Sequence, residues 1–138
     1  MSVGSQARKQ NNEIAYYEMK DSSIKANLEL INLFHPGAGE QIRAVVSEAT
    51  QRIIAETISA VELPENADEK GLRALRNNTW GAMHLLDMEG VTEEILTAAN
   101  AKAAELKITD TEILGIIRQL ATDVYDLRVT MEKDHWDR

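Results

Sequence analysis

The sequence of 138 residues contains no cysteine. This absence excludes disulfide bonds, thiolate metal sites and cysteine nucleophiles. Proline and glycine are also scarce, with two and seven residues respectively, which is few for a chain of many tight turns. Only 4% of the residues are aromatic although 43% are hydrophobic, so the core is aliphatic. An aliphatic core favours helices packed on helices over a β-sandwich.

Long apolar runs are absent as well. No window approaches the ~18 uninterrupted apolar residues of a transmembrane helix. Residues 1–10 also lack the apolar core of a signal peptide. We therefore expect a cytoplasmic protein that does not bind membranes.

Basic residues are outnumbered, with 15 Lys and Arg against 23 Asp and Glu, which gives a net charge of −8. Residues 1–35 carry four basic and four acidic side chains, so the whole excess of negative charge lies after residue 35. A surface that binds nucleic acid needs a basic excess. The charge therefore disfavours nucleic acid as a partner and favours basic proteins as partners.

The hydrophobic periodicity predicts an all-α fold, a bundle of four to five helices joined by short turns. Residues 1–12 have no periodicity and are predicted to form a polar N-terminal arm, followed by a single helical domain over residues 13–138. Residues 21–23 (Asp-Ser-Ser) are expected to interrupt the first helix and to cap a second one. The expected helices cover residues 13–35, 40–62, 68–89, 93–107 and about 109–133.

Several turns have recognisable signals. Gly90 fits the left-handed position after a helix, and Thr92 fits the N-cap of the next helix. Thr109 and Glu112 form the sequence pattern of a capping box. Lys107 stands at the turn between these last two helices, where a left-handed or altered backbone is expected.

The last helix carries the most regular apolar seam. Its positions repeat in steps of four and three residues, which predicts that a neighbouring helix packs against it. We expect part of this apolar surface to be buried between subunits, so that the protein is oligomeric. The seam consists of Ile113, Ile117, Leu120, Val124, Leu127 and Met131.

The turn before this helix has a second interpretation. Ala103 is a small residue on the first helix, and Leu106 and Ile108 bracket the turn. This pattern, over residues 99–118, resembles the helix-turn-helix core of bacterial and phage regulators.

The resemblance implies a recognition helix whose Thr111, Arg118 and Gln119 contact DNA. Among its exposed residues only Arg118 is basic, and Asp110 and Glu112 would face phosphate. Because DNA recognition relies on basic and amide side chains, a capped helix–helix corner is the favoured interpretation.

A cluster on the third predicted helix has the composition of a binding site. Trp and Arg dominate the energetics of many protein interfaces, and two arginines three residues apart can pair with a carboxylate or phosphate. The alternative is a helix break at the two asparagines with the tryptophan filling the core. The candidate residues are Arg73, Arg76, Asn77, Asn78 and Trp80.

A third candidate is an anion site in the turn at residues 36–41. Gly37, Gly39 and Gln41 lie at the start of a helix, where free N–H groups can bind a phosphate. The segment is similar to the proline-glycine turn before the second helix in phage cyclic-nucleotide sponges of the anti-CBASS type. A plain loop is the alternative.

No catalytic constellation is recognisable. Di-iron bundles need two Glu-x-x-His motifs, and only one, Glu132 with His135, is present. His84 and Asp87 have the spacing of an acid–base pair, but a histidine packed beside Trp80 and hydrogen-bonded to Asp87 is the commoner explanation. We expect no cofactor and no metal.

The sequence thus favours a non-enzymatic helical module for protein–protein interaction, of the adaptor or inhibitor type, which self-associates. A phage or mobile-element accessory protein would fit this description. The first alternative is a helix-turn-helix regulator of DNA. The second alternative is a binder, or sponge, of small anionic ligands such as nucleotides.

Overall fold

The computed structural model describes the backbone of residues 3–137 and the side chains of residues 12–137. Within this range the chain forms five α-helices and no strand, which confirms the expected all-α bundle. None of these helices is long and apolar enough to cross a membrane. The helices are α1 (Val3–Phe34), α2 (Ala38–Ser59), α3 (Glu69–Glu89), α4 (Glu93–Glu105) and α5 (Thr111–Trp136).

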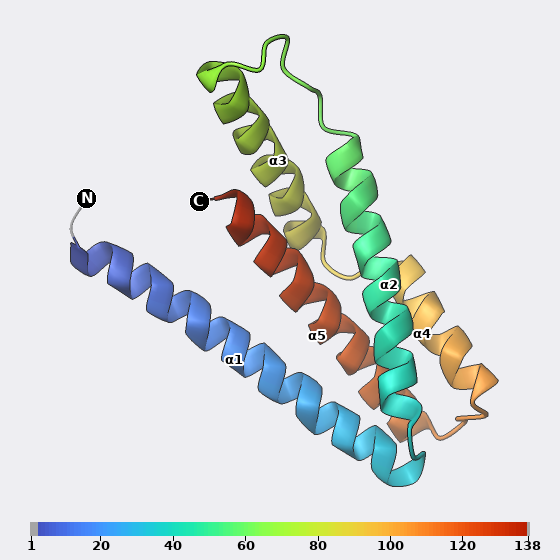
Figure 1. The fold of residues 1–138 in the computed structure, drawn as a ribbon. Coiled ribbons are helices and arrows are strands. Elements are labelled where there is room, and N and C mark those ends of the chain that lie inside the picture. The colour runs from blue at the N-terminus through green and yellow to red at the C-terminus, as the bar shows by residue number, and fades with distance from the viewer. Residues whose placement is uncertain (1–2, 138) are drawn as a thin grey trace.

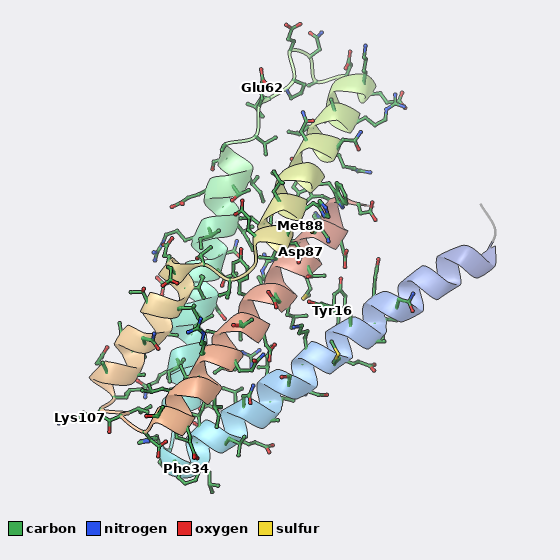
Figure 2. All side chains as sticks on the ribbon, turned by 180° about the vertical axis from the view of Figure 1, so that it is seen from behind. Tyr16, Phe34, Glu62, Asp87, Met88 and Lys107 are labelled. Carbon is green, nitrogen blue, oxygen red and sulfur yellow. The ribbon has the colours of Figure 1, made fainter. Side chains whose placement is uncertain are left out.

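Helix α5 lies at the centre of the bundle and contacts all four other helices (Figure 1). Helices α3 and α4 follow one another along its length, while α1 and α2 cover its other sides. Figure 2 shows Phe34 and Lys107 at one end of the molecule and Glu62 at the other. The fully buried side chains of α5 are Ile117, Leu120, Ala121, Tyr125 and Val129.

The predicted seam of α5 is buried over its first four positions, from Ile113 to Val124. Its last large residue, Met131, is 46% exposed. Beyond Val124 the buried side of the helix passes instead through Tyr125 and Val129. The neighbours of the buried seam are therefore helices of this same chain.

Helix α1 is continuous, so the expected break at residues 21–23 is wrong. Asp21 forms an ion pair of 2.9 Å with Lys25 one turn later, and Ser23 donates a 2.6 Å hydrogen bond to Asp123 of α5. Both polar side chains thus have partners outside the local backbone, so they do not end the helix. Residues 3–12 of the expected arm are the first turns of α1.

The turn from α4 to α5 contains the left-handed residue that the sequence indicates. Lys107 has φ 61°, a value that costs an L-residue free energy. The Ile108 N–H donates to Ala103 O at 2.9 Å, and the Lys107 N–H donates to Ala104 O at 3.0 Å. These two bonds form a Schellman motif, which satisfies the last carbonyls of α4.

The cap of α5 lies one residue later than the sequence pattern indicates. Asp110, not Thr109, is the N-cap, and its carboxylate accepts from the N–H groups of Glu112 at 2.8 Å and Ile113 at 3.2 Å. Its negative charge also suits the positive end of the helix dipole. The flanking Ile108 and Ile113 are both buried.

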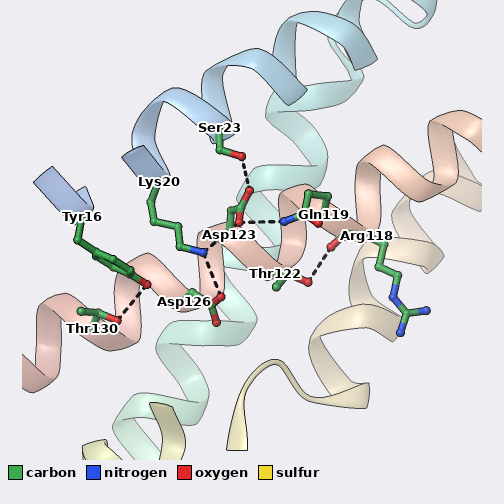
Figure 3. A network of polar contacts seen from close by, with 9 residues as sticks. All are labelled: Tyr16, Lys20, Ser23, Arg118, Gln119, Thr122, Asp123, Asp126 and Thr130. Carbon is green, nitrogen blue, oxygen red and sulfur yellow. Dashed lines mark hydrogen bonds and ion pairs between the residues drawn. The ribbon is translucent and has the colours of Figure 1, made fainter. Parts of the chain in front are cut away.

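A buried carboxylate attaches α1 to α5 (Figure 3). The Asp123 side chain is only 3% exposed and accepts from Ser23 at 2.6 Å, from Gln119 at 3.1 Å and from Lys20 at 3.3 Å. Lys20 also contacts Asp126 at 3.4 Å. With three donors the buried charge is satisfied, and the network fixes the rotation of α1 about its axis.

Replacing the cap residue tests where α5 begins. Asp110→Ala should destabilise the protein by about 1 kcal/mol because two helical N–H groups lose their acceptor. Thr109→Ala is the matched control and should change stability by less than about 0.5 kcal/mol. Urea unfolding followed by circular dichroism measures both variants. A larger loss in Thr109→Ala than in Asp110→Ala would show that the cap is misassigned.

Lys107→Gly should stabilise the protein by about 0.5 kcal/mol. The left-handed backbone costs lysine about 1 kcal/mol or more, whereas glycine adopts it freely but loses part of this gain through its more flexible unfolded chain. Gly90, which has φ 77°, provides the reverse experiment, since Gly90→Ala should destabilise. Thermal melts of the two variants should shift in opposite directions, and shifts in the same direction would contradict the assignment.

The Asp126 carboxyl should make stability depend on pH. Burial raises the pKa of Asp126 above its ordinary value near 4, although Lys20 acts in the opposite direction and the charges of Asp123 and Asp87 add to the rise. Between the ordinary and the raised pKa the folded state binds a proton that the unfolded state does not. The contribution of Asp126 to the free energy of unfolding therefore increases as pH falls from the raised pKa toward the ordinary pKa. The same contribution is lost as pH rises through the raised pKa.

Urea melts at pH values from about 4 to 7 measure this effect as the stability difference between the wild type and Asp126→Asn. The wild type should gain stability relative to Asp126→Asn as pH falls. Glu65→Gln, which removes a carboxyl from the exposed α2–α3 loop, is the control. A difference that does not vary with pH, or that varies with the opposite sign, would refute the raised pKa.

Candidate docking groove between α2 and α3

An open groove of about 940 Å³ lies between the C-terminal half of α2 and helix α3. One wall comes from the end of α2 and the residues that follow it, and the other comes from α3. It continues past Glu62 and Asn78 into a smaller hollow beside Leu63 and Pro64. The groove is lined by Glu56, Thr57, Ala60, Val61, Glu62, Asn77, Asn78, Gly81, Ala82, Leu85, Leu86 and Glu89.

Small residues on both walls keep the groove open. Ala60 lies on the α2 side, and Gly81 and Ala82 lie on the α3 side. A Cβ atom added at Gly81 would meet no atom within 4 Å, so the space beside it is empty. The last fully buried residue of α2 is Ile54, and beyond it the two helices diverge (Figure 1).

The groove combines apolar surface with negative charge. Leu85, which is 63% exposed, and the half-buried Val61 and Leu86 supply the apolar surface. Glu56 and Glu62 on one wall and Glu89 on the other supply negative charge. Of the side chains that line it in the described structure, none is basic. An apolar floor with acidic edges is complementary to an apolar ligand with basic edges.

The structure divides the predicted Arg/Asn/Trp cluster among different sides of α3. Asn77 and Asn78 line the groove, and α3 continues through them without the break considered as the alternative. Arg73 and Arg76 line a separate hollow of about 360 Å³ at the start of α3. Trp80 stacks on His84, with ring centroids 5.0 Å apart. These five residues therefore do not form one site.

The pair of His84 and Asp87 is not formed. Asp87 instead accepts a 2.6 Å hydrogen bond from Lys133 of α5. The Nδ1 atom of His84 is buried and has no hydrogen-bond partner among the described residues, and the same is true of Nε1 of Trp136. His84 packs beside Trp80 as expected, so its contacts are those of a structural side chain.

The predicted anion site retains its backbone shape, but its donors are occupied. Gly37 has φ 82°, and the Gly39 N–H donates to Asn32 Oδ1 at 2.8 Å. The Asn32 amide in turn donates to the carboxylate of Glu40 at 2.9 Å. Gln41 reaches back to the carbonyl of Gly37 at 3.5 Å. A bound phosphate would have to displace Asn32 and lie beside Glu40, so the anion site stays a prediction without geometric support.

The three DNA-binding candidates lie on the first turns of α5. Thr111, Arg118 and Gln119 are exposed, and Gln119 donates to Asp123. They share an exposed side of the N-terminal half of α5 with Glu112 and Gly115. A recognition helix must place most of one face in the major groove. The exposed side of α5 carries Glu112 beside the Asp110 cap, and among the described residues Arg118 is its one cation, so its charge does not support the helix-turn-helix interpretation.

In residues 12–137 no group of three His, Asp or Glu side chains comes together as a metal site would require. Comparison with known proteins adds no candidate function, because no protein-family model, curated protein or solved structure matches the chain. The groove is therefore a candidate binding site on the basis of its geometry alone. Sequence patterns missed most of it, since its floor consists of alanine, glycine and leucine residues that resemble any helix surface.

Proposed function

We propose that the protein is a non-enzymatic protein-binding module, of the adaptor or inhibitor type, whose α2–α3 groove binds an amphipathic helix of a basic partner. The observation that carries this proposal is the apolar groove with three glutamates at its edges and no lining cation in the described structure. Helix-in-groove binding uses this combination of an apolar floor and a polar rim.

The dimensions of the groove suit a short helix. Its α3 wall runs from Asn77 to Glu89, a length of about 18 Å at the rise of an α-helix. A partner helix of about three turns would span this length. The small side chains of Ala60 and Gly81 would allow its backbone to approach closely. Apolar residues at positions i, i+3 or i+4, and i+7 of the partner would then contact Leu85 and Leu86.

The glutamates define the charge of the partner. A phosphate-bearing ligand would meet Glu56, Glu62 and Glu89, so the groove disfavours nucleotides and nucleic acids. Lysine or arginine on the flanks of a helix would instead approach three carboxylates. Such exposed pairs add mainly to the association rate and make it depend on salt.

Filling the groove tests the proposal. Gly81→Leu places an apolar side chain in the empty space beside α3, and a leucine is also a better helix former than glycine. The matched control is Gly115→Leu, because Gly115 is also helical, also faces open space and lies on α5 outside the groove. Both variants should fold, as measured by circular dichroism and thermal melts.

Binding is measured with helical peptides selected from a displayed library against the wild-type protein. The selected peptides should combine an aliphatic stripe with Lys or Arg flanks. In fluorescence anisotropy, Gly81→Leu should weaken their binding at least about tenfold, which corresponds to about 1.4 kcal/mol, while Gly115→Leu should not. The proposal fails if selection yields no binder, if the selected peptides are acidic, or if Gly81→Leu binds them as well as the wild type.

A further inference from the structure

The outer face of α1 is a second, separate surface. Ile24, Leu28 and Ile31 point into the core, so the opposite side of the helix faces solvent. This outer side has a heptad spacing over residues 15–33, and its two large apolar side chains, Met19 and Leu33, are 58% and 73% exposed. The residues of the outer stripe, all of them exposed, are Ala15, Met19, Ser22, Ala26, Glu29 and Leu33.

Two opposite charges flank this stripe on the same side. Glu18 and Lys25 are seven residues apart, so they occupy the same heptad position, and both are exposed. When two identical helices pair in antiparallel orientation, residues at this flanking position face each other across the interface. A parallel pair would place them against the other flank, which carries Ser23 and Leu30 instead of a charge.

We propose that the outer face of α1 binds a second copy of this chain, with the two α1 helices antiparallel about a twofold axis. In this arrangement Met19 lies opposite Ser22 of the second copy, and Ala15 lies opposite Ala26 of the second copy. Each of these two layers contains at least one small residue, which allows the helices to approach closely there. In the same register the exposed Glu29 lies opposite the polar Asn12 of the second copy. A twofold interface is also the commonest way in which identical chains associate.

The charges select one register. In the register described above, Glu18 faces Lys25 of the second copy, and the twofold axis repeats this pair. A shift of one heptad in one direction places Lys25 against its own counterpart, and a shift in the other direction places Glu18 against its own counterpart. Each shift therefore replaces two attractive pairs with like charges, which destabilises the pairing.

The length of α1 also agrees with this pairing. Helix α1 has 32 residues, and its N-terminal turns extend away from the bundle (Figure 1). In the antiparallel pair the backbone of these turns runs along the C-terminal part of α1 in the second copy. There Leu30, Leu33 and Phe34 are exposed, by 43%, 73% and 62% respectively. The projecting turns of each copy would cover this apolar surface of the other.

Helix α1 does not line the α2–α3 groove. An experiment that refutes the self-association surface therefore does not refute the groove, and the reverse also holds. The two surfaces together would produce a dimer that presents two grooves.

Charge reversal and its compensation test the pairing. Lys25→Glu should weaken the dimer by roughly tenfold because it places Glu18 against a glutamate at both ends of the interface. The combined variant Glu18→Lys, Lys25→Glu exchanges the two charges and should restore the wild-type affinity. Arg43→Glu, which reverses a positive charge at an exposed position of α2, is the control and should leave the affinity unchanged.

Sedimentation equilibrium over micromolar concentrations measures each dissociation constant, and circular dichroism verifies that each variant is folded. The expected result is a wild-type dimer that Lys25→Glu weakens and the exchanged pair restores. The proposal is overturned by a wild-type monomer at about 100 μM, a concentration at which a specific interface should be occupied. It is equally overturned if Lys25→Glu has no effect or if the exchanged pair remains as weak as Lys25→Glu.

Discussion

The burial of α5 among the other four helices is the constraint on which the rest of the structure depends. Side chains on nearly every side of this helix, among them Ile117, Leu120, Tyr125 and Val129, are excluded from solvent. Because α1, α2, α3 and α4 all contact α5, each of them leaves part of its surface outside the core. Their remaining sides are free to carry other features. The α2–α3 groove and the outer face of α1 both lie on such free sides.

A single buried carboxylate makes this arrangement specific. The buried Ile24, Leu28 and Ile31 already turn one side of α1 to the core. Asp123 adds a directional requirement, because it needs Lys20, Ser23 and Gln119 as donors in fixed places. Leaving that carboxylate buried without them would cost several kcal/mol. The network and the buried apolar side chains together determine which side of α1 faces outward, and with it the position of the stripe through Met19 and Leu33.

Features that depend on neighbouring residues were predictable from the sequence. Local backbone chemistry predicts the helical periods and the N-cap at Thr92. It also predicts the positive φ angles of Gly90 and Lys107. The cap of α5 was misplaced by one residue, because Thr109 and Asp110 are both good caps and the Schellman turn decides between them. The expected break in α1 failed because Ser23 finds its acceptor 100 residues away. The groove could not be predicted, since it arises where side chains are small and two helices diverge.

Hydrogen exchange of the native protein tests most directly whether α5 organises the fold. The amides from Ile117 to Val129 should exchange only through global unfolding, with the highest protection in the chain, because every opening that exposes them must first separate α5 from its neighbours. The N-terminal turns of α1 and the end of α2 beside the groove should exchange earlier through local opening. An α5 whose amides exchange as fast as those of α3 or α4, well below the global unfolding free energy, would contradict this account.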